Sequence, residues 1–349
     1  MTRRHTARAA VGRLRGWGGV TCMAVACAVT ASLTLLPLRI DSDPAGVVSA
    51  TRPGTAHATT VRTTDCDPWT SVPASAADGK KIEEIKKRGH LIVGVDQNSF
   101  NWGYRDPTNN RIQGFDIDLA KAIAADILPA TPEDERVVFR VVSTADRVKL
   151  LETGDVDIVV RTMTIDCAKH VAFSLPYFTA GQQVLAPKSM KITGYDASLV
   201  GKRVCTADGS SARKNLERLR KGDRQYGVIH DPEHVPAGQS ADGLHVPNQL
   251  DCLVRLQLGE VAAVITDDAL AAAQIAQDPS VEFKGTTFTE EYYGVAANTE
   301  ATDLVARINQ VLAKYTGGGA NGPWTTSYNR WLEKTLPGKV APTKPSGTG

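Results

Sequence analysis

One ten-residue pattern occurs twice in the chain and restricts the possible folds more than any other feature. Residues 151–160 (LETGDVDIVV) and 256–265 (LQLGEVAAVI) both show the end of a helix, a glycine stop, an acidic residue and a buried strand. Strands and helices alternate along the chain around these copies, which is typical of an open α/β sheet. We therefore predict an α/β protein with two lobes, each an open, mostly parallel sheet with flanking helices.

Polar residues follow the buried strand directly in both copies. Thr162 of the first copy aligns with Asp267 of the second. The carboxyl ends of strands are where open α/β sheets bind ligands. A further strand at 201–206 leads to Ser210 and Ser211, which are suited to cap a helix whose free N–H groups attract an anion. Two such lobes predict a cleft that closes on a small ligand.

The predicted cleft contains groups that suit a zwitterion. A ligand carboxylate needs a cation together with hydroxyl and backbone donors, whereas a ligand ammonium needs a carboxylate. Both attractions strengthen when closure removes water. The candidate ligand-binding residues are Gln97, Phe100, Arg161, Thr162, Thr164, Lys169, Ser210, Ser211 and Asp267, with Arg147 as a possible contact of a ligand side-chain carboxylate.

Further motifs occur in a fixed order: GFDIDL at 114–119, TMTI at 162–165, FSLPYF at 173–178, and the pair Trp324 and Trp331. In this order they resemble the extracytoplasmic solute-binding proteins of polar amino-acid ABC transporters, and the glutamate-binding members most of all. The resemblance extends over nearly the whole predicted body. It implies capture of an acidic or polar amino acid, glutamate, aspartate or asparagine, and its delivery to a transporter permease.

The resemblance also implies a type II periplasmic-binding-protein-like fold, in which two crossover strands form the hinge between the lobes. Here those strands are expected near 177–185 and 288–297. The expected organisation is a signal-anchor at 1–39, a disordered linker at 40–79, the first lobe at 80–180, the second lobe at 181–289, a return to the first lobe at 290–336 and a disordered tail at 337–349.

By the same resemblance, Thr164 and the cation that follows it hold the ligand α-carboxylate, and Asp267 holds the α-amino group. The family usually has an arginine in the loop after the threonine motif, whereas this chain has Lys169 there. A lysine lacks the bidentate fork of arginine, so Arg161 is the alternative holder of the carboxylate.

Four cysteines, Cys66, Cys167, Cys205 and Cys252, lie in the predicted body and its linker, and two more lie in the apolar N-terminal stretch. Four cysteines allow three pairings, and their spacing is unlike that of zinc sites. The two lobes favour the pairs Cys66–Cys167 and Cys205–Cys252. Such disulfides fit an oxidising compartment outside the cytoplasm.

The N-terminal stretch supports the same location. Five arginines precede residues 16–38, which contain no charged residue and are long enough to cross a bilayer as a helix. We expect a retained anchor that holds the protein on the extracytoplasmic face of the membrane. A cleaved signal peptide, which makes the protein secreted, and a lipoprotein modified at Cys27 are the alternatives.

Charge and composition exclude other classes of protein. The chain has 40 basic and 38 acidic residues, and the basic excess lies at the N-terminus, so a dedicated nucleic-acid binder is excluded. A hydrophobic content of 42% fits a globular body. Pro232 interrupts the histidine-rich span 230–234, which argues against a metal site there. We expect a monomer without a cofactor or a bound metal.

Two other functions stay open at this point. A permanently anchored chain could report ligand occupancy to a membrane signalling protein instead of a permease. An enzyme on the same fold is less favoured, because the cleft shows no paired acid and base. Some site residues also have structural readings: Arg147 as a surface charge, Phe100 as core and Asp267 as a helix cap.

Overall fold

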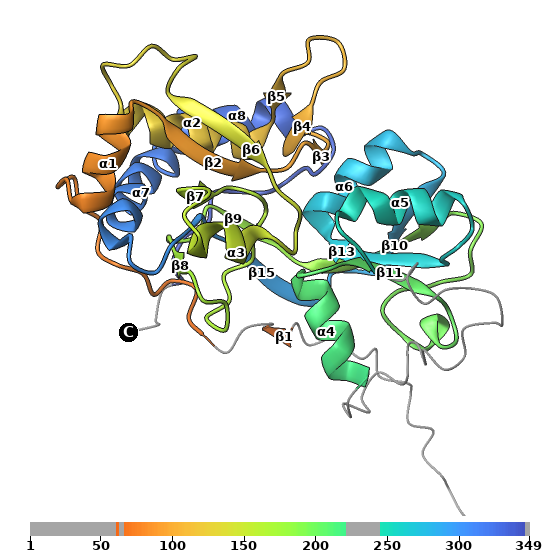
Figure 1. The fold of residues 1–349 in the computed structure, drawn as a ribbon. Helices are drawn as coiled ribbons and strands as arrows, with labels where there is room; N and C mark the ends of the chain where they lie inside the picture. Colours follow the sequence, from red (N-terminus) through yellow and green to blue (C-terminus); the bar gives the residue numbers. More distant parts are fainter. Residues whose placement is uncertain (1–60, 63–65, 221–244, 346–349) are drawn as a thin grey trace, which may run out of the picture. The chain divides into compact units, whose positions relative to one another are not determined.

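The computed structural model describes residues 61–62, 66–220 and 245–345 (Figure 1). The first lobe is built on a five-stranded sheet of order β6-β2-β7-β16-β8. Strand β2 pairs in parallel with β6 and β7, whereas β16 pairs antiparallel with β7 and β8. The strands of this sheet are β2 (Leu91–Val95), β6 (Val137–Val141), β7 (Ile158–Val159), β8 (Ala172–Phe173) and β16 (Ala296–Ala297).

Five helices and a small sheet complete the first lobe. Apolar side chains at helical spacing, such as Leu304, Ile308 and Leu312, are buried in its core. The helices are α1 (Lys80–Arg88), α2 (Phe115–Ile127), α3 (Arg147–Glu152), α7 (Thr302–Tyr315) and α8 (Pro323–Trp331), with the short 3₁₀ turn η5 (Gly319–Asn321) before α8. The small sheet consists of β3 (Asn98–Ser99), β4 (Gly103–Arg105) and β5 (Ile112–Gln113).

The second lobe is a five-stranded sheet of order β12-β11-β13-β10-β14. Strand β11 pairs in parallel with β12 and β13, and β10 pairs antiparallel with β13 and β14. Its strands are β10 (Gln182–Pro187), β11 (Val204–Ala207), β12 (His245–Val246), β13 (Ala263–Asp267) and β14 (Val281–Lys284). Its helices are the 3₁₀ turn η1 (Ala197–Leu199), α4 (Ser211–Arg220), α5 (Gln249–Gln257) and α6 (Asp268–Gln277).

Two antiparallel strands connect the lobes. Strand β9 (Phe178–Ala180) pairs with β15 (Thr289–Tyr293), and Figure 1 shows β15 passing between the two large sheets. Strand β1 (Val61–Arg62) adds to the far edge of β15 in parallel. The predicted two-lobed architecture with two crossover strands is therefore confirmed. Both sheets are mixed rather than mostly parallel, because the strands next to the crossovers pair antiparallel.

Two segments predicted to be disordered are held by specific contacts. In the predicted linker, Asn309 donates to the carbonyl of Val72 at 2.7 Å, and Arg307 pairs with Asp78 at 2.8 Å. In the predicted tail, Lys339 pairs with Asp268 of α6 at 2.7 Å. Composition alone does not reveal these partners, because they lie hundreds of positions away or on another lobe. Within 66–79 and 337–345, segments whose composition predicts disorder therefore make specific polar contacts with the body.

Some predictions lie outside the described residues. These are the signal-anchor at 1–39, most of the linker before Cys66 and the histidine-rich span 230–234. Within the ranges that the structure describes, every helix is too short or too polar to cross a membrane.

Candidate functional site

A cavity lies between the two lobes, at the strand ends that the repeated pattern indicates. Side chains from the first lobe and from the second lobe face each other across it. Most of the residues predicted for ligand binding are among those that line it. The lining residues are Arg147, Thr162, Thr164, Lys169, Ser210, Ser211, Ala212, Gln249, Thr266 and Asp267.

Arg147 supplies a buried cation to this cavity. Only 4% of the residue is exposed, so the reading of Arg147 as a surface charge is wrong. Its guanidinium donates to the carbonyls of Thr144 (2.9 Å), Arg161 (3.2 Å) and Gly209 (3.2 Å). A guanidinium has five N–H donors, so two remain for a ligand. Burial, and then the neighbouring Arg161, lower the pKa of Arg147 to about 9.

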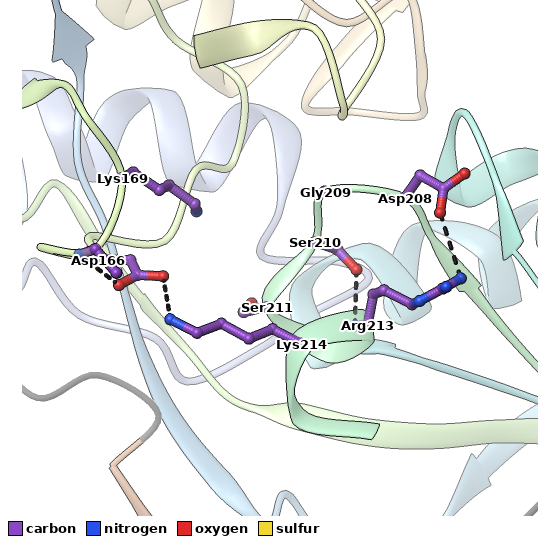
Figure 2. Close-up of a pocket in the computed structure, with 9 residues that line it drawn as sticks. Asp166, Lys169, Asp208, Gly209, Ser210, Ser211, Arg213 and Lys214 are labelled. Atoms are coloured by element: carbon purple, nitrogen blue, oxygen red, sulfur yellow. Dashed lines mark hydrogen bonds and ion pairs between the residues drawn. The ribbon is translucent and has the colours of Figure 1, made fainter. Parts of the chain in front are cut away.

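Lys169 supplies a second cation from the loop after β7. Its ammonium donates to the carbonyl of Thr164 at 3.3 Å, which leaves two of its three donors for a ligand. Burial, and then the charge of Arg147, lower the pKa of Lys169 to about 8. Figure 2 shows the Lys169 side chain extending into the space between the lobes. Two desolvated cations on one cavity wall favour an anionic ligand group.

Asp267 supplies the carboxylate on the opposite lobe, at the end of β13. Its side chain accepts a hydrogen bond from the Tyr293 hydroxyl at 2.5 Å. Asp267 occupies the N-cap position of α6, yet its side chain makes no capping hydrogen bond, so the capping interpretation is wrong. Burial, and then the nearby Glu291, raise the pKa of Asp267 to about 8. A ligand ammonium placed here stabilises the ionised form.

The end of β7 is held in an unusual backbone conformation. Thr162 has φ +42°, in the left-handed region that β-branched residues rarely adopt. Its N–H donates to the buried carboxylate of Asp116 at 3.0 Å, which also accepts from the Tyr177 hydroxyl at 2.9 Å. Burial raises the pKa of Asp116 to about 7. These contacts fix the turn that directs Thr162 and Thr164 toward the cavity.

The start of α4 faces the first lobe. The Ser210 hydroxyl accepts from the N–H of Arg213 at 3.0 Å and so caps the helix. The Ser211 hydroxyl lies 3.3 Å from that of Thr164 across the cleft. The capped helix end and the hydroxyls provide the polar donors expected around an anion.

An outer pocket continues from the cavity and shares Lys169, Ser210 and Ser211 with it. Figure 2 shows Lys214 of α4 reaching across to Asp166 of the first lobe, and the two form an ion pair at 2.8 Å. The carboxylate of Asp166 has a lowered pKa, although burial opposes the effect of Lys214. The pair therefore stabilises the closed arrangement of the lobes in which it forms.

Three predicted residues lie outside the cavity lining. Arg161 is 1% exposed and pairs with Asp96 at 3.1 Å, so its guanidinium is directed away from the predicted ligand. The side chain of Gln97 accepts from Arg105, and Phe100 packs on Tyr104. Arg161 contacts Asp96, Thr144 and Asn248, and it is not among the residues that line the cavity with Lys169.

Sequence reasoning missed two polar lining residues. Thr266 aligns with Arg161 in the repeated pattern, so the alignment contained a signal for it. Gln249 begins α5 after the two-residue strand β12, and a strand this short shows no period.

The structure contains the two disulfides that the lobes favour. Cys66 is bonded to Cys167, and Cys205 to Cys252. The first bond holds the segment before the first lobe against the loop that carries Lys169. The second lies inside the second lobe, where both cysteines are fully buried.

Residues 91–334 match the family model of bacterial extracellular solute-binding proteins, family 3. The chain is 30% identical over 255 residues to the ABC transporter glutamine-binding protein GlnH of Bacillus subtilis, covering 72% of this chain and 85% of the relative. It is 32% identical over 228 residues to a glutamine-binding protein of Geobacillus stearothermophilus, covering 65% and 79%.

A mutant of ArgBP from T. maritima has a similar solved structure. The TM-score is 0.61 at 28% identity, with 73% of this chain and all of that chain covered. The two-lobed fold, the cavity at the strand ends and the family match over most of the body agree. The chain belongs to the bacterial extracellular solute-binding proteins of family 3.

Proposed function

We propose that this protein captures an α-amino acid with an acidic side chain, glutamate or aspartate, and delivers it to the permease of an ABC transporter. The observation that carries the proposal is the charge of the cavity wall. Among the described lining residues, Arg147 and Lys169 are cationic and Asp267 is anionic. Two cations and one carboxylate complement a ligand that has two carboxylates and one ammonium.

The positions of these groups suggest how such a ligand binds. Lys169 and the hydroxyls of Thr164 and Ser211 form one polar cluster, which suits the α-carboxylate. Asp267 lies on the opposite lobe and suits the α-ammonium. Arg147 suits the side-chain carboxylate, because its hydrogen bonds to the described residues use three of its five N–H donors. The ligand then contacts both lobes, so closure increases the number of its interactions.

Ligands with amide or cationic side chains complement the charges of the cavity wall less well than glutamate or aspartate. The relatives from Bacillus subtilis and Geobacillus stearothermophilus are named as glutamine-binding proteins, and another similar structure is that of arginine-bound ArgBP from T. maritima. An amide oxygen of glutamine or asparagine can accept from Arg147, but it leaves that charge uncompensated. An arginine side chain adds a third cation. We therefore place glutamate and aspartate first, the amides second and cationic amino acids last.

The same proposal includes the location of the protein. The two disulfides and the family's extracellular character support a place on the extracytoplasmic side, with residues 1–39 as the membrane anchor. We infer that ligand release to the permease needs no covalent chemistry and that the protein works as a monomer.

Calorimetric titration of the ligand-stripped protein tests the proposal. Glutamate, aspartate, asparagine, glutamine and arginine are titrated separately under one condition. We expect one-to-one binding of an acidic amino acid, with the amides at least about tenfold weaker because a charge-assisted hydrogen bond is lost. Absence of binding to all five ligands, or tightest binding to arginine, contradicts the proposal.

A further inference from the structure

Gln249 lines the cavity from the first turn of α5, and the function of its side chain follows from its partners. The residue is 8% exposed. Its side-chain oxygen lies 3.3 Å from the Thr144 hydroxyl of the first lobe. Its backbone carbonyl accepts from the Gln274 amide at 2.8 Å, which fixes the start of the helix. Gln249 is thus held from both lobes.

A chain of hydrogen bonds decides which end of the Gln249 amide faces the ligand. Arg161 pairs with Asp96 at 3.1 Å and donates to the Thr144 hydroxyl oxygen at 2.8 Å. An arginine side chain can only donate, so the Thr144 hydroxyl oxygen accepts from Arg161. The hydroxyl proton of Thr144 then remains available for donation to another group. Donation to Gln249 Oε1 uses that proton, and a buried hydroxyl proton without an acceptor is costly.

This orientation leaves the NH₂ group of Gln249 for the cavity. Within the described parts of the chain, no residue accepts a hydrogen bond from Nε2 of Gln249. Arg147 lies beside Gln249, since both side chains contact Thr144: the guanidinium of Arg147 donates to the Thr144 carbonyl. Next to Thr144, the described cavity wall therefore presents two donor groups to a ligand side chain, the NH₂ of Gln249 and the guanidinium of Arg147.

We propose that Gln249 selects ligands whose side chain ends in an oxygen acceptor, and that Thr144, Arg161 and Asp96 are positioning residues that orient its amide. The inference rests on the proposed function, since it assumes an amino acid bound through its α-groups. Charge alone disfavours ligands with cationic side chains. Selection by Gln249 also disfavours neutral side chains that end only in N–H donors. A ligand side chain that ends only in N–H donors, charged or neutral, meets the Gln249 NH₂ and the Arg147 guanidinium there, and buried donors left unpaired discriminate strongly.

Reversing the chemistry of this one side chain tests the inference. The ligands are glutamate and arginine, titrated into the ligand-stripped wild type and Gln249→Glu. The variant replaces donors with a carboxylate at nearly unchanged volume. We expect the ratio of glutamate to arginine affinity to fall by about 100-fold or more, because a ligand carboxylate then meets a carboxylate. Gln249→Met keeps the length without the donor, and we expect it to weaken glutamate about tenfold.

The positioning residues need a separate readout. Thr144→Val removes the hydroxyl that orients the amide, whereas Thr144→Ser keeps it. We expect Thr144→Val to lower the ratio of glutamate to arginine affinity several-fold and Thr144→Ser to restore it, with thermal unfolding confirming that both variants fold. If Thr144 has only a structural role, Thr144→Val lowers the melting temperature but leaves the ratio of glutamate to arginine affinity unchanged. That result rejects the positioning role.

The outcomes separate the two proposals. A wild type that binds no amino acid rejects the proposed function and this inference with it. A wild type that binds glutamate, together with an unchanged affinity ratio in Gln249→Glu, rejects only the selection by Gln249.

Discussion

At the scale of single residues, the site concentrates ionisable groups that are costly to bury without partners. Arg147 and Asp267 are both nearly inaccessible to solvent. Burial lowers the pKa of Arg147 and raises that of Asp267, so each charge is disfavoured in the empty site. A zwitterionic ligand supplies the missing opposite charges. The residues that bind the ligand are therefore expected to destabilise the protein when no ligand is present.

Asp267→Asn tests this cost. The pKa of Asp267 is about 8 in the folded protein and near 3.8 when unfolded, so the folded state retains a proton that the unfolded state releases. The stability that protonation contributes is complete below about pH 4 and is lost as the pH rises through about 8. The variant does not ionise. We expect it to be more stable than the wild type at pH 8.5, and to differ little from the wild type at pH 4.

Urea unfolding of both proteins without ligand, at pH 4 and at pH 8.5, measures the difference. A stability gap that stays constant between the two pH values contradicts the raised pKa of Asp267.

The charge of Lys169 is expected to limit glutamate affinity at high pH. Its pKa is lowered to about 8, so its charge is lost as the pH rises above that value. We expect the affinity for glutamate to fall between pH 8 and pH 9 in the wild type, and to fall less in Lys169→Arg, whose guanidinium stays charged. Titration calorimetry at both pH values measures this. Because the ligand titrates identically in the two proteins, an equal fall in both argues against Lys169 as the carboxylate partner.

Among the elements, the turn before α4 packs directly against the first lobe next to the cavity. Gly209 has φ +70°, and a Cβ there lies 2.9 Å from the Cα of Ala145 in the first lobe. A methyl group at this position forces the lobes apart. The carbonyl of Gly209 also accepts from Arg147, so the same turn holds a ligand-binding cation.

Gly209→Ala should therefore weaken binding more than it weakens folding. Gly259 is the matched control, because it has φ +71° with open space around its Cβ. Both substitutions carry the cost of a left-handed alanine, about 1 kcal/mol. We expect only Gly209→Ala to lower glutamate affinity, by about tenfold or more, since only it opposes closure. Equal affinities in the two variants, measured by calorimetry, contradict a contact that matters for closure.

The loop that carries Lys169 depends on a disulfide. Cys167 lies two residues before Lys169 and is exposed, whereas Cys205 and Cys252 are fully buried. A dithiol under native conditions is expected to reduce Cys66–Cys167 first, because thiolate attack requires access to the sulfur. Release of the loop removes a constraint on the Lys169 ammonium, so we expect glutamate affinity to fall several-fold.

Alkylation and mass spectrometry identify which cysteines are free at each dithiol concentration, and calorimetry follows binding. The double variant Cys66→Ser, Cys167→Ser should reproduce the effect of reduction. Full affinity in that variant shows that the loop is held by its other contacts alone.

At the scale of the whole molecule, the sequence predicts the lobes and the facing strand ends well. Repeated patterns such as 151–160 and 256–265 indicate local structure, and their alignment puts Thr162 and Asp267 at equivalent strand ends of the two lobes, where both line the cavity. Side-chain direction is less accessible to such reasoning. Arg161 follows the same strand end, but its guanidinium turns to Asp96, which ends a neighbouring strand. Contacts of that kind depend on tertiary packing.

The segments at the two ends of the body also show that sequence composition does not reveal tertiary contacts. Polar, proline-containing composition predicts disorder for 66–79 and 337–345, because such segments bury little apolar surface. The structure holds them instead through single polar contacts, such as Asn309 to Val72 and Lys339 to Asp268. Composition describes the segment, whereas these contacts depend on partners elsewhere in the fold.

We propose that an amino acid binds between the lobes with its ammonium on Asp267 and its carboxylates on the cations Arg147 and Lys169. Titration of L-glutamate into the wild type and into Asp267→Asn at pH 7.5 tests this binding mode, because the variant keeps the shape of the side chain and removes its charge. We expect one-to-one binding by the wild type and at least about 100-fold weaker binding by the variant. Equal affinity of the two proteins for glutamate rules this binding mode out.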